Sequence, residues 1–301
     1  MKKYLLVLLS GFALAGCATP AKHNSNTAIP AGSRYVAMGS SYAAGPGVTT
    51  PAETPTTRCS RSSDNYAHQL TRKRNLTLVD VSCSGATTDH LLGPWNELPP
   101  QLDAVNSDTK LVTITIGGND VGFVSGLFAS SCEGAASNPN IVPPPICRAM
   151  AESQSPAAAQ ARAQMNAPMD EAKWQTLAKH FDQIITDVHR KAPSARLIFV
   201  DYLTVVPERK FCDSVPLTTD GATIARTLAK RLKQLTADAA KRGGAEILAA
   251  SDMSKTHDAC AKTAWITGFI VPAGSKGFTP YHPNLTGMTA IAEALDTRLG
   301  F

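Results

Sequence analysis

The 301-residue sequence has no block of lysine and arginine and no basic stripe interleaved with aromatic residues. Its formal net charge of +5 is too mild to indicate binding to DNA or RNA, so we expect no nucleic-acid partner. It has no CxxC pair and no paired histidine spacing, which argues against a structural zinc ion. Neither an internal repeat nor a linker follows Ser33, so residues 34–301 are predicted to form a single domain.

A long apolar run is missing as well. The apolar stretch Tyr4–Leu14 follows Lys2 and Lys3, and it is shorter than the roughly 20 residues that a membrane-spanning helix needs. Its length is typical of a signal peptide, and it ends in Leu14-Ala15-Gly16-Cys17, which resembles the lipobox of bacterial lipoproteins. In those proteins the cysteine is lipidated and becomes the new N-terminus. The alternative is an ordinary secretory signal in which Cys17 is incidental.

The lipobox resemblance implies three segments at the N-terminus. Residues 1–16 would be a signal peptide, Cys17 would carry the lipid, and residues 17–33 would form a polar, flexible tether. The residue after Cys17 is Ala18 rather than aspartate, which by the sorting rule of enteric-type bacteria favours the outer membrane. We therefore expect a protein of the bacterial cell envelope, attached to the membrane through Cys17.

Six further cysteines are present. An exported chain with six cysteines is expected to form three disulfides, for which fifteen pairings are possible. The sequential pairing is the simplest, because it closes three separate loops. The six are Cys59, Cys83, Cys132, Cys147, Cys212 and Cys260.

Short β-branched runs alternate with helical patterns, which predicts an α/β fold with a parallel sheet of about five strands. The expected strands are Arg34–Met38, Leu76–Val81, Leu111–Ile116, Arg196–Val200 and Ala245–Leu248. The expected helices are Asn65–Arg74, Glu171–Arg190, Gly221–Arg242 and Leu285–Leu299. Ala43–Ser63 and Ser130–Pro168 are rich in Pro, Thr, Gly, Ala or Ser and show no such period, and for the second we expect a lid or an acyl-chain wall.

Four short segments carry the polar residues of interest. GSSYAAG (Gly39–Gly45), CSGATT (Cys83–Thr88) and GGND (Gly117–Asp120) each follow a predicted strand, and His282-Pro283-Asn284 opens the last predicted helix. In open α/β sheets, ligands bind at the carboxyl ends of the strands. Each segment alone also has a structural explanation, since a serine after a strand is most often a helix cap and Gly-Gly-Asn-Asp is a plausible turn.

Together, in this order, the four segments resemble the SGNH (GDSL) hydrolases, specifically the secreted lipase/esterase branch with three disulfides. The resemblance extends over nearly all of residues 34–301. It implies a three-layer, flavodoxin-like α/β/α sandwich in which Ser41 is the nucleophile and His282 the general base. The oxyanion hole would consist of the N–H groups of Ser41 and Gly85 and the Asn119 amide.

The same resemblance implies the hydrolysis of acyl esters through an acyl-enzyme, as in a lipase, an esterase or a phospholipase. No cofactor and no metal would be needed, and we expect a monomer. The family pattern also favours the disulfides Cys59–Cys83 and Cys212–Cys260. Cys132 and Cys147 bracket the Pro-rich part of residues 130–168, so we expect the third disulfide, Cys132–Cys147, there. Two other functions remain open at this point: O-deacetylation of a polysaccharide or of the cell wall, and a non-catalytic envelope lipoprotein that has kept the fold.

The sequence departs from the family pattern at two acidic positions. Ser40 stands where the family has the aspartate of G-D-S-Y, and Thr279 stands three residues before His282, where the family places the triad aspartate. We therefore predict a Ser41–His282 dyad, in which a main-chain carbonyl of Gly277–Tyr281 orients the histidine. Asp252 and Asp258 are the rival acids.

Overall fold

Five parallel strands form one central sheet, in the spatial order β2-β1-β3-β4-β5. The computed structural model describes residues 28–152, 170–208, 210–270 and 279–300. The order is that of doubly wound, flavodoxin-like folds, and each predicted strand agrees with an observed one to within two residues at either end. The strands are β1 (Arg34–Gly39), β2 (Thr77–Asp80), β3 (Thr109–Thr115), β4 (Arg196–Val200) and β5 (Glu246–Leu248).

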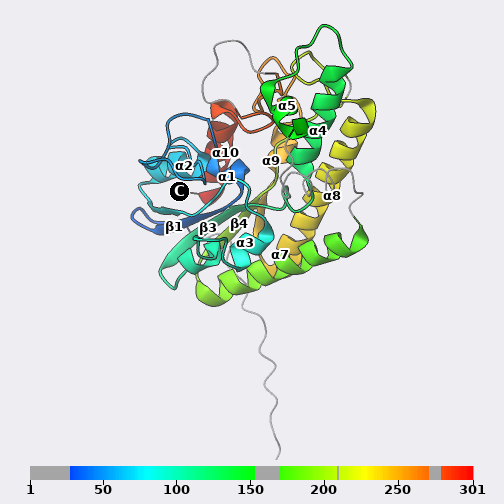
Figure 1. The fold of residues 1–301 in the computed structure, drawn as a ribbon. Helices are drawn as coiled ribbons and strands as arrows, with labels where there is room; N and C mark the ends of the chain where they lie inside the picture. Colours follow the sequence, from blue (N-terminus) through cyan, green and yellow to red (C-terminus); the bar gives the residue numbers. More distant parts are fainter. Residues whose placement is uncertain (1–27, 153–169, 209, 271–278, 301) are drawn as a thin grey trace, which may run out of the picture.

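Helices cover both faces of this sheet (Figure 1). On one face α2 (Tyr66–Arg74) packs against α10 (Leu285–Leu299), and the Arg74 guanidinium donates to the Asp296 carboxylate across the pair, at 2.5 Å. On the other face lie α7 (Glu171–Lys191) and α8 (Thr219–Gly243), which also pack against each other. The predicted three-layer α/β/α sandwich is therefore confirmed.

Helix α7 shows why the apolar pattern of the sequence specifies this packing. Its Asp170 side chain accepts a hydrogen bond from the Lys173 amide and so caps the first turn. From there, apolar residues at helical spacing form one buried stripe, and Phe181 of this stripe contacts Phe199 of β4 with ring centroids 5.4 Å apart. The predicted stripe is thus core packing between the helix and the sheet.

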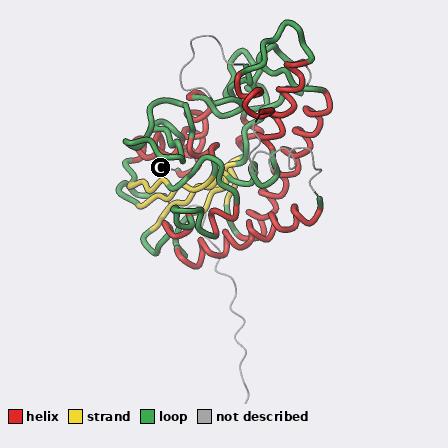
Figure 2. The backbone as a smooth tube through the Cα atoms, in the orientation of Figure 1, coloured by secondary structure: helices red, strands yellow, loops and turns green. Residues whose placement is uncertain are grey.

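Several shorter helices were not expected from the sequence (Figure 2). They are α1 (Ser41–Ala44), α3 (Thr88–Leu92), α4 (Phe123–Ala136), α5 (Pro145–Glu152), α9 (Ala250–Met253) and the 3₁₀-helix η1 (Gln101–Ala104). The prediction of one long irregular segment over residues 130–168 is wrong in its first half, because residues 130–136 complete α4 and residues 145–152 form α5. Residues 153–168 lie outside the described residues.

The folded domain begins before Arg34. Ile29 is buried, the Gly32 amide donates to the Asn75 carbonyl, and the Thr77 amide donates to the Ser33 carbonyl. Ile29, Gly32 and Ser33, which fall in the segment predicted to be a flexible tether, thus belong to the folded domain. Cys17 and the predicted signal peptide lie outside the described residues. Within the described ranges, none of the helices combines the length and the apolar character that crossing a bilayer requires.

Three disulfides join the loops, in the sequential pairing predicted from the sequence. Cys59–Cys83 fixes the segment that follows β2, and Cys132–Cys147 joins α4 to α5. Cys212–Cys260 joins the segment after β4 to the segment after α9. All three bridges thus lie in connections that leave the carboxyl ends of strands or the helices that follow them.

Candidate active site

Ser41 lies at the carboxyl end of β1, where the winding of the sheet reverses. Strand β1 has β2 on one side and β3 on the other, and this switch point is where open α/β sheets bind ligands. Ser40 occupies the N-cap position, so Ser41 is the first residue of α1 and its N–H has no acceptor within the helix. The Ser41 side chain is almost buried, with 7% of the residue exposed.

His282 reaches Ser41 from the loop that precedes α10. Its Nε2 lies 2.7 Å from the Ser41 Oγ, and its Nδ1 lies 2.7 Å from the Pro280 carbonyl oxygen. Because a carbonyl can only accept, the ring proton belongs on Nδ1, which leaves the Nε2 lone pair facing the Ser41 hydroxyl. Burial lowers the pKa of His282 to about 4, while the bond to Pro280 acts in the opposite direction. The ring is therefore neutral at physiological pH, as a general base must be.

Tyr281 shapes the turn that brings the Pro280 carbonyl onto the histidine ring. Its φ is +57°, in the left-handed region that a bulky side chain rarely adopts. The Tyr281 ring is buried against Phe128 and Phe269, its hydroxyl bonds Ser131 Oγ at 2.5 Å, and its carbonyl accepts from the Tyr42 hydroxyl at 2.5 Å. These contacts hold the strained residue, and they connect the histidine loop both to α4 and to the residue after Ser41.

Gly85 lies in the segment that follows β2, next to β1. The Cys83 amide donates to the Gly39 carbonyl at 3.0 Å, which ties this segment to the end of β1 two residues before Ser41. Gly85 has φ +89°, and a Cβ at this position would lie 3.1 Å from the Trp95 ring. Only glycine adopts this backbone conformation without strain, so the conformation of the predicted oxyanion donor depends on the residue type.

Asn119 follows β3 and is bound to the Gly85 segment. Its Nδ2 donates to the Ala86 carbonyl at 2.8 Å, and the second N–H of the amide can serve another acceptor. Beside it, the half-buried Asp120 carboxylate accepts from the Thr88 amide at 3.0 Å, and burial raises the pKa of this carboxyl. Two separate hydrogen-bonded links thus join the segment after β2 to the segment after β3.

Sequence comparison identifies the family of the chain. The model of the GDSL-like lipase/acylhydrolase family matches residues 37–290, most of the chain. The chain belongs to this family. The protein is accordingly a carboxylic ester hydrolase.

Its relatives include lipases and an esterase of Streptomyces. Lipase 2 of Streptomyces coelicolor is 29% identical over 266 residues, which cover 86% of this chain and 83% of that protein. The crystal structure of phospholipase A1 from Streptomyces albidoflavus superposes with a TM-score of 0.67 at 25% identity, covering 89% of this chain and 100% of that one. The lipase of Streptomyces rimosus has the same fold, with a TM-score of 0.66, 24% identity and coverages of 88% and 99%.

Neither rival acid of this GDSL-like hydrolase contacts the histidine through a hydrogen bond or an ion pair in the described structure. The Asp252 carboxylate binds the Lys233 and Lys255 ammonium groups at 2.7 Å each, and the Asp258 carboxylate accepts from the Cys260 amide at 2.8 Å. Thr279 does not accept the histidine proton either, because its hydroxyl donates to the Pro46 carbonyl. The acceptor at His282 Nδ1 is the Pro280 carbonyl, within the segment where the sequence places it.

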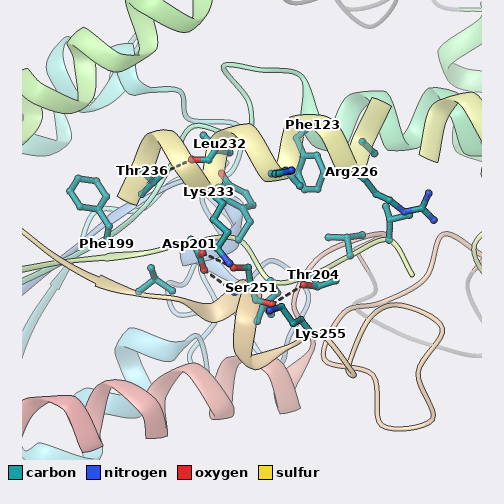
Figure 3. Close-up of a pocket in the computed structure, with 18 of the residues that line it drawn as sticks. Phe123, Phe199, Asp201, Thr204, Arg226, Leu232, Lys233, Thr236, Ser251 and Lys255 are labelled. Carbon is teal, nitrogen blue, oxygen red and sulfur yellow. Dashed lines mark hydrogen bonds between the residues drawn. The ribbon is translucent and has the colours of Figure 1, made fainter. Parts of the chain in front are cut away.

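A separate cavity of about 380 Å³ lies between α8 and the segment after β4 (Figure 3). Its walls are apolar, with Phe123, Phe199 and Leu232, while Lys233 and Lys255 stand among its polar groups. Neither Ser41 nor His282 lines it, but Tyr202 does. Among the described residues, no cluster of three or more His, Cys, Asp or Glu side chains could hold a metal ion.

The family pattern pointed to Ser41, His282, Gly85 and Asn119, but it gave no signal for two contacts at the site. The Tyr42 hydroxyl and the Tyr281 carbonyl meet across 239 positions of sequence, and Tyr202 contacts Ser40 across 162. Their roles depend on which loops the fold brings together. The letters Tyr-x-x-Gly within GSSYAAG could have marked Tyr42 as a site residue, because it is part of the family's first block.

Proposed function

We propose that the protein hydrolyses acyl esters through an acyl-enzyme on Ser41, at the bacterial cell envelope, to which Cys17 would anchor it. His282 would be the general base, and the oxyanion would be stabilised by the N–H groups of Ser41 and Gly85 and by the Asn119 amide. The observation that carries the proposal is the Ser41 Oγ–His282 Nε2 distance of 2.7 Å, with the Pro280 carbonyl 2.7 Å from Nδ1.

The reaction follows from the proton positions. His282 Nε2 takes the Ser41 proton as Oγ attacks the ester carbonyl, and the resulting tetrahedral oxyanion lies among the three donors. The imidazolium then gives its proton to the leaving alcohol, and the acyl-enzyme remains. A water molecule, which loses a proton to His282 Nε2, then attacks the acyl-enzyme. The acid is released, and the proton returns to Ser41 Oγ to restore the hydroxyl. In this dyad the neutral Pro280 carbonyl orients the ring but stabilises the imidazolium less than a carboxylate would.

Two observations favour acyl esters of lipids as substrates. The family model is that of lipases and acylhydrolases, and one structural relative is a phospholipase A1 whose fold covers 89% of this chain. A lipid anchor at Cys17 would in addition hold the enzyme at a membrane, where such esters are concentrated. The run Leu14-Ala15-Gly16-Cys17 supports this part of the proposal.

A profile of activity against acyl length tests the substrate class. We expect turnover of p-nitrophenyl esters from acetate to long acyl chains, and release of fatty acid from phospholipid. Activity on acetate alone would favour the deacetylase, and a folded protein without turnover on any ester would identify a binding lipoprotein. Either result contradicts the proposal.

The neighbouring serines provide a matched pair of variants. Ser41→Ala should abolish turnover, because the nucleophile is lost. Ser40→Ala should keep most of it, because Ser40 Oγ does not bond to His282 and because the Gly118 N–H keeps the Tyr202 hydroxyl as its acceptor. Labelling with a fluorophosphonate, followed by peptide mapping, should modify Ser41. A label on Ser40 would reverse the assignment.

A further inference from the structure

The Tyr202 hydroxyl lies between the two segments that carry the candidate catalytic groups. Tyr202 follows β4, and its oxygen is 3.1 Å from the Ser40 Oγ and 2.9 Å from the Gly118 nitrogen. Ser40 precedes the candidate nucleophile, and Gly118 precedes Asn119. One buried hydroxyl from a third strand therefore contacts the residue next to each of these two groups.

The hydrogen atoms can be assigned from donor and acceptor chemistry. The Gly118 N–H can only donate, so the Tyr202 oxygen accepts from it. The single Tyr202 proton is then free to point to Ser40 Oγ, whose own proton points to the Thr115 carbonyl, at 3.5 Å. Burial raises the pKa of Tyr202 well above its usual range, so the hydroxyl keeps this proton throughout the working pH range. Tyr202 can thus accept and donate at the same time.

Steric contacts make this arrangement specific. A Cβ on Gly118 would lie 2.6 Å from the Tyr202 hydroxyl, so only glycine lets the hydroxyl reach the backbone there. The Tyr202 ring packs against the Tyr42 ring with centroids 4.5 Å apart, and against Phe123 edge-on at 6.0 Å. Tyr42 follows Ser41 in the chain. Tyr202 therefore contacts the residues on both sides of the candidate nucleophile as well as the residue before Asn119.

From these contacts we propose that Tyr202 is a positioning residue, whose hydroxyl fixes the register of the Ser41 turn against the Asn119 turn. This inference rests on the proposed function, because it assigns Tyr202 a part in placing the oxyanion donors. Position 40 is where the family motif has an aspartate and this chain has a serine. A carboxylate oxygen at position 40 would extend one bond farther than Ser40 Oγ, toward the place that the Tyr202 hydroxyl occupies. In this proposal, a neutral hydroxyl from the segment after β4 stands in for a carboxylate from the segment after β1.

The first experiment removes the hydroxyl and keeps the ring. Tyr202→Ala is unsuitable, because Tyr202 lines the cavity of Figure 3 and a truncation would enlarge it. In Tyr202→Phe the Gly118 N–H loses its acceptor, and Asn119 shifts relative to Ser41. Since oxyanion donors act in the transition state, kcat on p-nitrophenyl butyrate should fall about 10- to 100-fold, with KM within two-fold of wild type.

A transition-state analogue gives a readout that general loss of packing would not produce. A trifluoromethyl ketone forms a tetrahedral adduct on the nucleophile and places an oxyanion among the donors. Its inhibition constant should rise in Tyr202→Phe by the same factor by which kcat/KM falls. Tyr66→Phe is the matched control, since the buried Tyr66 hydroxyl also bonds to the end of β3, at Thr115 Oγ1 (3.1 Å). This variant should change neither kcat nor the inhibition constant.

The decisive experiment is a rescue. Adding Ser40→Asp to Tyr202→Phe offers the Gly118 N–H a carboxylate oxygen in the space left by the hydroxyl, and at least half of the lost kcat, on a logarithmic scale, should return. If Tyr202→Phe alone does not fold, the double variant still tests the proposal, because it should be folded and active. A double variant that folds but is inactive contradicts the proposal. Wild-type kcat in Tyr202→Phe also contradicts it. In contrast, activity that survives Ser41→Ala overturns the proposed function itself.

Discussion

The position of one proton on His282 determines how the candidate site responds to pH. Nδ1 donates to the Pro280 carbonyl and Nε2 faces Ser41, so a second proton can bind only at Nε2, where it blocks the general base. Burial lowers the pKa of this ring to about 4, because the buried site disfavours the charged form. A carboxylate at Nδ1 would have acted in the opposite direction by stabilising the imidazolium.

We therefore predict that activity persists well below neutral pH. As the pH falls through about 4, His282 becomes protonated and kcat/KM is lost, whereas a histidine with an unperturbed pKa would lose half its function near pH 6.5. The measurement is kcat/KM for a short-chain ester between pH 3.5 and 8, with circular dichroism at each pH to verify folding. If kcat/KM of the folded protein instead fell with a midpoint between pH 6 and 7, the lowered pKa of His282 would be contradicted.

The absence of a triad carboxylate is tested at two further residues. Asp252→Asn and Asp258→Asn should each leave kcat within a few-fold of wild type, because these carboxylates bind Lys233 and Lys255 in one case and the Cys260 amide in the other. Loss of a true triad aspartate costs on the order of 10⁴ in kcat. A decrease of that size in either variant would show that the acid of the triad has been relocated.

At the scale of elements, the loops that carry the site are held by elements far away in sequence. Helix α4 supplies Ser131 and Phe128, which hold Tyr281 in its left-handed conformation and so keep the Pro280 carbonyl on the histidine. The Cys59–Cys83 bridge holds the segment that leads to Gly85. Phe128, Ser131 and Cys59 lie outside the four short segments of the sequence analysis, whereas Cys83 opens the second of them.

Removing individual disulfides should separate stability from activity. Replacing the pair Cys59 and Cys83 by serine should lower kcat most, because Cys83 lies two residues before Gly85 and helps to place an oxyanion donor. Replacing the pair Cys212 and Cys260 is the control: a bridge typically contributes about 2–4 kcal/mol to stability, so this variant should unfold more easily but retain kcat. Chemical denaturation measures the stability of both variants, and kcat measures their activity. Equal kcat in the two would show that the Cys59–Cys83 bridge does not position Gly85.

The sequence predicts an element well where the pattern of its own residues reports its environment. The all-buried run Thr113-Ile114-Thr115-Ile116 and the stripe of α7 are such cases. Helix α4 was missed because FVSGLFASSCEGAA contains glycine and serine and little charge, so neither a polar face nor helix propensity marks it. The site follows the same rule: Ser41 and His282 lie in local motifs, whereas the contacts of Tyr202 and Tyr281 arise only when distant loops meet.

At the scale of the whole molecule, the strand order explains why the candidate site residues lie together at the carboxyl ends of the strands. Because β1 lies between β2 and β3, the segments after these three strands meet, and Ser41, Gly85 and Asn119 each follow one of them. The loop before α10 then adds His282. The N-terminal residues 28–33 run beside β2, where the Ser33 carbonyl accepts from the Thr77 amide. The chain that precedes the domain is thus attached near the β2 edge of the sheet.

Anchoring is the prediction that belongs to this scale. If Cys17 carries lipid, wild-type protein should fractionate with membranes and should partition into the detergent phase of a Triton X-114 separation. Cys17→Ala should leave unprocessed precursor or release soluble protein, while kcat on a soluble ester is unchanged, because Cys17 precedes the folded domain. A wild-type protein that is fully soluble and unlipidated would disprove the anchor.

The bridge next to Gly85 also has a consequence for the cell that makes the enzyme. In the reducing cytosol Cys59 and Cys83 would stay as free thiols, so a newly made chain would lack the link that holds the candidate oxyanion donor. An enzyme that cleaves acyl esters is made close to the producer's own lipids, and we expect it to be nearly inactive there. Under the proposed export, oxidation outside the cytosol would complete the enzyme, so that leaving the cytosol and becoming active would be one event.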